Sequence, residues 1–215
     1  MRTWMNKGLL RRGLWATGLL GLALLQGCAT RVKADATQNP APATALSAFS
    51  RIELQPARLA TGVQGNEAAV AKIQENLVKD LAEVLPAWNA GPDNGRKLTI
   101  TPVVEQLQFN AGAKRVLLGP MAGSSGVQMR LQMRDEAGRE VATPEFYQRA
   151  GAWAAGFVMG VHDNLMLTRV ANLASGYLIA NYKDAVGGPT GADDKAVGGK
   201  RAAAPASTPA PAPVQ

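Results

Sequence analysis

The chain has 215 residues, 47% of them hydrophobic and 18% charged, which is enough for one medium-sized domain with tails. Its formal net charge is +7 at pH 7. Four basic residues precede residue 28, where no acidic residue offsets them, so the remainder carries 19 basic and 16 acidic residues and a net charge of +3. The remainder has no Lys/Arg stripe with interleaved aromatic residues, so the composition argues against a nucleic-acid-binding protein.

The first 27 residues have the pattern of an export signal. Positive charges occupy residues 2–12, and residues 13–25 form an uncharged apolar stretch, shorter than the roughly 20 residues of a transmembrane helix. The following Leu25-Gln26-Gly27-Cys28 resembles the lipobox of bacterial lipoproteins, in which a peptidase cuts ahead of a cysteine that receives a diacylglycerol thioether. We therefore predict a lipoprotein signal peptide over residues 1–27 and lipidation of Cys28.

Cys28 is the only cysteine, so it has no partner for an intramolecular disulfide in the oxidising compartment to which the signal leads. Lipidation would remove an exposed thiol, and two or three acyl chains would hold the protein on a membrane. Because Ala29 rather than Asp follows the cysteine, the resemblance implies the outer membrane, facing the periplasm. The alternative is an incidental thiol at the end of an uncleaved anchor or of an ordinary signal peptide.

Two stretches with few large apolar residues flank the centre of the chain. Residues 28–46 are small, polar and proline-containing, which predicts a flexible tether. Residues 184–215 are rich in Gly, Ala and Pro, which predicts a disordered tail with polyproline II character. The alternative for the tail is a contact with the cell wall or with a partner's aromatic groove. The intervening residues 47–183 are predicted to form the folded domain.

Periodicity orders the first elements of this domain. Residues 49–54 alternate weakly and predict a strand that stops at Pro56. A helix follows, with Asn66 as its N-cap and an end before Pro86. The apolar stripe of this helix consists of Val70, Ile73, Leu77, Leu81 and Val84.

Further strands and a second helix follow. Residues 97–109 predict a strand whose apolar phase slips at Pro102, which indicates a bulge or an edge position. Residues 127–133 alternate strictly between apolar and polar side chains, which predicts one buried and one solvated face. A turn over residues 135–139 leads into a partner strand that starts at Glu140. The last helix is predicted to be capped by Asp163, to end near Tyr182 and to bury Met166, Val170, Leu173 and Tyr177.

This order of strand, helix, strands and helix is typical of an α+β fold. We predict a small, largely antiparallel sheet with two main helices packed on one face.

No constellation of catalytic or metal-binding residues stands out in the sequence. His162 is the only histidine, and with Cys28 assigned to lipid no His/Cys zinc set is left, so a structural or capping role is favoured for His162. Ser124 and Ser125 lie in the Gly-rich segment 119–126, which matches neither a G-x-S-x-G motif nor a P-loop and is interpreted as a turned connection. We therefore predict no catalytic residue, metal, cofactor or identifiable small-molecule substrate. A periplasmic hydrolase would need a site assembled from distant residues.

Residues 150–161 carry no charge and are too few to span a bilayer as a helix. A core strand or a packed connection is the simpler interpretation. The alternative is a surface that meets a membrane or a second copy of the chain, where small residues permit close approach.

The segment 114–127 has an Arg, a short apolar run and a Gly-rich turn, and it continues as an alternating strand that ends in Asp135 and Gly138. This pattern resembles a family of uncharacterised bacterial lipoproteins of unknown function, although Pro120 replaces the more usual aromatic or aliphatic residue. The resemblance covers most of residues 47–183 and implies no catalytic residues. The order of elements is also similar to that of curli-secretion and penicillin-binding-protein-activator lipoproteins, which is an analogy of fold alone.

These features predict a non-enzymatic lipoprotein that is anchored in the outer membrane through lipid and binds another envelope protein or a copy of itself. The alternative is an accessory lipoprotein of a secretion or cell-wall-synthesis machine.

Changing Cys28→Ala should leave the precursor uncleaved and unacylated, because the thiol is the atom that accepts the lipid. Mass spectrometry of the purified chain measures both properties, and globomycin treatment of cells should produce a precursor of the same size. An unchanged size in treated cells, together with an unmodified Cys28, would contradict lipidation.

Overall fold

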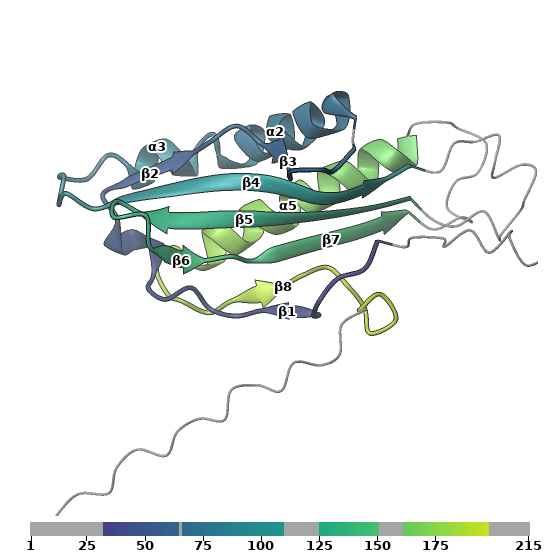
Figure 1. Ribbon diagram of the computed structural model, residues 1–215. Helices are drawn as coiled ribbons and strands as arrows, with labels where there is room; N and C mark the ends of the chain where they lie inside the picture. Colours follow the sequence, from purple (N-terminus) through teal and green to yellow (C-terminus); the bar gives the residue numbers. More distant parts are fainter. Residues whose placement is uncertain (1–31, 65, 110–124, 151–160, 198–215) are drawn as a thin grey trace, which may run out of the picture. The chain divides into compact units, whose positions relative to one another are not determined.

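The computed structural model describes residues 32–64, 66–109, 125–150 and 161–197, with the backbone alone at residues 161–163. Two long helices pack on one face of a mixed sheet, as Figure 1 shows. The α+β class with two main helices and a largely antiparallel sheet, which the order of elements predicts, is thereby confirmed.

The helices are α2 (Glu67–Leu81), α3 (Val84–Trp88) and α5 (Val161–Ala180), with a short 3-10 turn η2 (Leu46–Ala48). The strands are β1 (Gln38–Asn39), β2 (Arg51–Leu54), β3 (Arg58–Leu59), β4 (Lys97–Gln108), β5 (Ser125–Asp135), β6 (Glu140–Ala142), β7 (Glu145–Ala150) and β8 (Gly188–Pro189).

The two long strands β4 and β5 pair antiparallel at the centre of the sheet. β6 and β7 extend the sheet beyond β5, also antiparallel, whereas β2 and β3 run parallel to β4 on its other side. The predicted turn at residues 135–139 joins β5 to β6, and Gly138 adopts the positive φ of 76° that this turn requires.

Pro102 lies within β4 without a bulge, so the predicted position of the phase slip is wrong. Pro102 pairs with Leu131 in regular register, and the register shifts instead between Val104 and Gln106. β4 is also a central strand rather than an edge. Proline lacks an N–H group, and it is tolerated here because the break between β2 and β3 falls opposite it.

The Asn66 signal at the start of α2 and its end before Pro86 are confirmed, but Val84, predicted on the stripe of this helix, lies in the separate helix α3. The Asn66 side chain accepts a hydrogen bond from the Ala68 N–H at 2.8 Å, as an N-cap does. α2 ends at Leu81, and Pro86 lies in the first turn of α3, where an N–H would have no partner within the helix. α5 begins before Asp163, which therefore lies inside the helix rather than at its cap.

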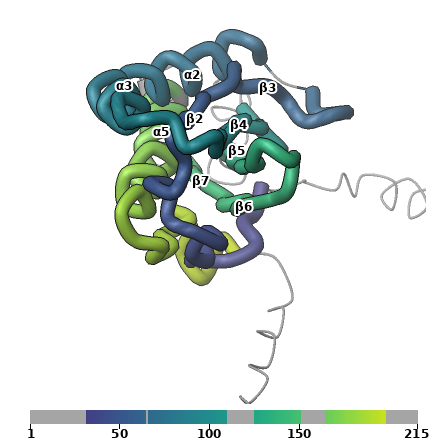
Figure 2. Tube along the Cα trace, turned by 90° about the vertical axis from the view of Figure 1, so that its left-hand side faces the viewer, coloured from purple at the N-terminus to yellow at the C-terminus, as the bar shows by residue number. Residues whose placement is uncertain are grey.

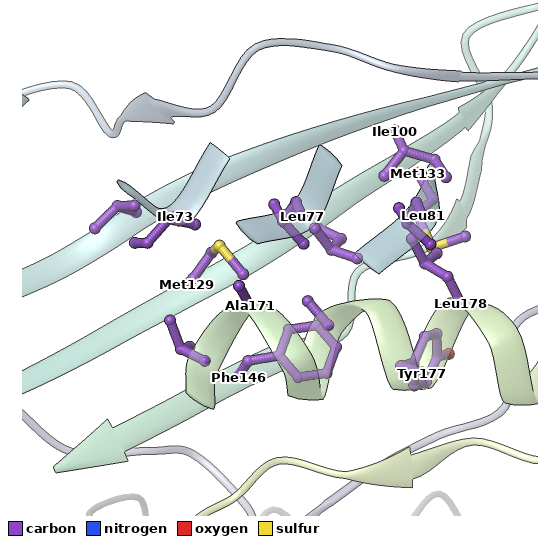
Figure 3. Close-up of a cluster of buried hydrophobic side chains, with 14 of the residues drawn as sticks. Ile73, Leu77, Leu81, Ile100, Met129, Met133, Phe146, Ala171, Tyr177 and Leu178 are labelled. Atoms are coloured by element: carbon purple, nitrogen blue, oxygen red, sulfur yellow. The ribbon is translucent and has the colours of Figure 1, made fainter. Parts of the chain in front are cut away.

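The main core lies between the helices and the sheet, and Figure 3 shows its side chains. The apolar stripes of α2 and α5 meet the inner face of β4, β5 and β7 there. The residues labelled in that view are Ile73, Leu77, Leu81, Ile100, Met129, Met133, Phe146, Ala171, Tyr177 and Leu178.

An asparagine side chain closes each edge of the sheet. On β2, the Ile52 N–H donates to Asn89 Oδ1 at 2.7 Å, and Asn89 Nδ2 donates to the Ile52 carbonyl at 2.9 Å. On β7, Asn39 makes the same pair of bonds with the Glu145 backbone, both at 2.7 Å. Each amide thus replaces one residue of a neighbouring strand, which blocks further strand pairing at that point.

Residues 32–46 and 184–197 differ from the predicted flexible tether and disordered tail. β1 pairs antiparallel with β8, and Ala34, Leu46, Thr190 and Ala196 are buried. These segments are held by backbone hydrogen bonds and small side chains, which a search for large apolar residues does not detect.

The outer face of the sheet, opposite the helices, is also more covered than the alternation in β5 predicts. Gln128 is only 3% exposed, and a Cβ at Gly126 would lie 2.9 Å from the Cβ of Val32. The face becomes solvated only towards Arg134, which is exposed. The prediction of a wholly solvated face is therefore wrong at the start of β5, because the N-terminal segment lies over it.

Replacing Leu77→Ala should lower the free energy of unfolding by about 2–5 kcal/mol, because Leu77 is fully buried between α2 and the sheet. Its neighbour Val78 is 52% exposed and provides the matched control, since Val78→Ala on the same helix should change the stability by less than about 0.5 kcal/mol. Urea unfolding followed by circular dichroism measures both values. Equal losses in the two variants would contradict the placement of α2.

Candidate functional site

The strongest concentration of buried polar groups lies beneath the segment 32–39, which we call the N-terminal strap. The strap runs beside residues 188–197, which we call the C-terminal arm. The Ala34 N–H donates to the Ala196 carbonyl at 3.1 Å, and the Thr190 N–H donates to the Thr37 carbonyl at 3.0 Å. Figure 1 shows β1 and β8 lying along the β7 edge of the sheet, and Figure 2 shows the same fold turned by 90°.

Glu145 at the start of β7 is the centre of this site. Its side chain is 4% exposed, and its carboxylate accepts three hydrogen bonds. The Asp35 N–H donates to Oε1 at 2.8 Å, Gln128 Nε2 donates to Oε2 at 2.7 Å, and Arg130 Nη2 donates to Oε2 at 3.0 Å. Together with Asn39 on its backbone, Glu145 ties the strap to two strands of the sheet.

Arg130 links Glu145 to two further carboxylates. Its Nε donates to Glu105 at 3.0 Å, and its Nη2 reaches Asp35 at 3.3 Å. Burial by itself would lower the pKa of Arg130, but the hydrogen bond to Glu105 and the charges of Glu105 and Glu145 outweigh burial and raise the pKa. One guanidinium therefore faces three carboxylates, which leaves a local excess of negative charge when all of them are ionised.

The pKa of Glu145 is raised above its ordinary value. Burial is the largest cause, and the charge of Asp35 acts in the same direction, against the hydrogen bonds from the Asp35 N–H and from Gln128. Protonation of Glu145 would reduce the excess of negative charge beneath the strap.

Gln128 and Tyr177 complete the surroundings of the strap. Oε1 of Gln128 is buried and has no hydrogen-bond partner among the described residues. From the helix side, the Tyr177 hydroxyl donates to the Pro40 carbonyl at 2.9 Å, and burial raises the pKa of Tyr177 to about 12. The sheet thus fixes the strap itself, and the helix layer fixes Pro40, the residue that follows it.

This arrangement holds the strap in place on the sheet. Among residues 32–64, 66–109, 125–150 and 161–197, no group of three His, Cys, Asp or Glu side chains has the arrangement of a metal site. In the same part of the chain, no helix is long and apolar enough to cross a membrane.

The residues that the sequence singles out do not meet at this site. Ser125 is a buried residue at the start of β5, and His162 lies in the first turn of α5 with its side chain outside the described part. Cys28, Ser124 and most of the uncharged segment 150–161 also lie outside the described residues, so the predictions for them stay predictions.

Sequence reasoning missed Asp35, Arg130 and Glu145. Asp35 and Glu145 are 110 residues apart in the chain, and Asp35 lies in a segment whose composition predicts a tether. The available signal was weak, because charged residues on the polar side of a strand are ordinarily solvated.

Comparison with known proteins gives a similarity to solved structures only. No family model matches the chain, and no curated protein matches it either. Two solved structures of PelC dodecamers from Paraburkholderia phytofirmans are similar to it. One, a single-residue variant, has 14% identity and a TM-score of 0.33 and covers 62% of this chain and 90% of its own. The other has 12% identity and a TM-score of 0.34. The match covers 62% of this chain and 91% of the PelC chain. Similarity at this level establishes neither a family nor a function.

Changing Glu145→Gln should flatten the dependence of stability on pH. Because the folded pKa of Glu145 is raised, the folded chain holds the proton more tightly than the unfolded chain, and the wild-type protein should lose stability as the pH rises through that pKa. Glutamine does not ionise, so the variant should lack this loss. Urea unfolding at a series of pH values between pH 4.5 and 8 measures the slope.

The exposed Glu140 supplies the control for this experiment. Glu140→Gln removes the same charge from β6 and should leave the wild-type slope in place. If Glu145→Gln and wild type lose stability in parallel as the pH rises, titration of Glu145 is not the cause of the loss.

Proposed function

We propose that this chain is a non-enzymatic lipoprotein, anchored through Cys28 in the outer membrane and facing the periplasm. It acts by binding, as an accessory component of an envelope machine for secretion or cell-wall synthesis. Its partner is another envelope protein or a second copy of the chain.

The observation that carries the proposal is the short distance in sequence between the lipidation motif and the fold. Four residue steps separate Cys28 from Val32, and Val32 packs on the satellite cluster of Ala34, Tyr147 and Ala196. A chain covers at most about 3.6 Å per residue, so acylation at Cys28 would hold Val32 within about 14 Å of the lipid attachment.

An anchor of this length has a functional consequence. A long linker lets a domain sample a wide volume around its anchor. A short linker keeps the domain beside the membrane and limits which of its surfaces a soluble partner can reach. The strap, clamped by Asn39 and Glu145, would transmit this restriction to the sheet. Such placement suits a component that works at a fixed height within an assembly.

A flexible Gly/Ser insertion of about 20 residues between Arg31 and Val32 should weaken partner contacts in intact cells, since it adds a mean span of roughly 25 Å between lipid and domain. The same insertion after Val197, beyond the C-terminal arm, is the matched control and should leave the contacts unchanged. Crosslinking in cells followed by mass spectrometry measures the yield of each crosslinked pair.

The proposal requires crosslinks to other envelope proteins or between copies in the wild type, and their loss on the N-terminal insertion alone. Equal yields from both insertions would contradict a role that depends on a short anchor. If crosslinks form only between copies of this chain, self-assembly remains as the function. The proposed role as an accessory of a secretion or cell-wall-synthesis machine then loses its support.

A further inference from the structure

A hollow of about 360 Å³ lies between the end of β7 and the C-terminal arm, outside the Glu145 site. Residues 147–149 of β7 line one side of it, and Gly191, Asp193, Lys195 and Ala196 of the arm line the other. Tyr147 and Ala196 belong to the satellite apolar cluster, so the hollow combines an apolar part with several polar groups. The charged side chains of Arg149, Asp193 and Lys195 are exposed, so the hollow is open to solvent.

The approach of the arm to β7 depends on Gly191. Its φ is +85°, and a Cβ there would overlap the Leu173 side chain and lie 2.6 Å from the Tyr147 carbonyl oxygen. Only glycine therefore lets the arm pass this close to β7 without strain. The hollow is formed by the close approach of two segments that are distant in sequence.

The charged groups of the hollow are two cations and one carboxylate. Arg149 and Lys195 supply the cations and Asp193 supplies the carboxylate. Burial raises the pKa of the Tyr147 hydroxyl, the charge and hydrogen bond of Arg149 act to lower it, and the charge of Asp193 acts to raise it. Arg149 and Asp193 also line the same hollow, so a ligand there would meet both signs of charge.

The hollow also lies at the end of the sheet that Val32 covers. Arg149 is paired in register with Gly126, and Val32 lies over Gly126. If Cys28 is acylated, as the proposed function requires, this end of the sheet is held beside the headgroups of the bilayer.

We propose that the hollow binds the phosphoethanolamine headgroup of a membrane lipid. The phosphate has one negative charge and several acceptor oxygens, which match the donors of Arg149 and Lys195. The ammonium group has one positive charge and N–H donors, which match the carboxylate of Asp193. The bilayer in which the protein is anchored is the source of this ligand.

The test uses the full-length protein purified in a phosphate-free detergent, with soluble glycerophosphoethanolamine as the probe. Saturation-transfer NMR or calorimetric titration measures its binding. We expect glycerophosphoethanolamine to bind more tightly than glycerophosphocholine, whose methylated ammonium has no N–H donor, and more tightly than inorganic phosphate, which has no cation for Asp193.

Two variants and a control assign the binding to the hollow. Arg149→Gln and Asp193→Asn should each weaken binding of glycerophosphoethanolamine by about tenfold, because each removes one charge-assisted contact. Lys79→Gln on the exposed side of α2 removes a cation elsewhere and should have no effect. Urea unfolding confirms that each variant retains the wild-type stability.

Equal binding of phosphate and glycerophosphoethanolamine, with no effect of Asp193→Asn, would replace the proposed site by a simple anion site. No binding of glycerophosphoethanolamine would overturn the proposal. Acylation of Cys28 is measured separately by mass spectrometry on the same preparation. An acylated chain that ignores the probe therefore refutes the headgroup site alone, and a probe-binding chain without acyl groups refutes the anchor alone.

Discussion

The fold depends on how the β7 edge of the sheet is closed. Without a neighbour, this edge would leave the backbone N–H and C=O groups of Glu145 unpaired beside a buried carboxylate. Asn39 satisfies both backbone groups, and the Asp35 N–H with Gln128 and Arg130 satisfies the carboxylate. A buried charge that lost these donors would cost several kcal/mol, so the strap and the sheet stabilise each other.

The two faces of the sheet are therefore covered by different physical means. On the helix side, α2 and α5 bury long apolar side chains, and the interaction depends on volume and surface area. On the outer side, the strap and the arm bury small residues and polar groups, and the interaction depends on hydrogen-bond partners and charge. The first kind of layer tolerates changes of pH, whereas the second contains a carboxylate with a raised pKa and responds to them. We therefore expect pH to affect the outer layer more than the helix layer.

The elements that could be predicted from the sequence are those whose signal is local. The Asn66 cap, the stripe of α2 up to Leu81, the apolar face of Val127 to Met133 and the turn at Gly138 all lie within short windows, and the structure has each of them. Asn39, Asp35 and Glu145 act across more than 100 residues of sequence, and the composition around Asp35 carries no trace of their pairing. Pro102 illustrates the same limit. A proline fits inside the central strand β4 because the gap between β2 and β3 lies opposite it, and the sequence around Pro102 does not contain this information.

The central claim is that the strap is part of the fold, held on β7 by polar contacts. Amide hydrogen exchange of the native protein tests it most directly at the Ala34 and Asp35 N–H groups, which donate to the Ala196 carbonyl and to Glu145. The account predicts that both amides exchange far more slowly than in a free peptide, with protection that approaches that of the central strand β5. Exchange of both amides at the rate of an unstructured chain, while β5 stays protected, would contradict it.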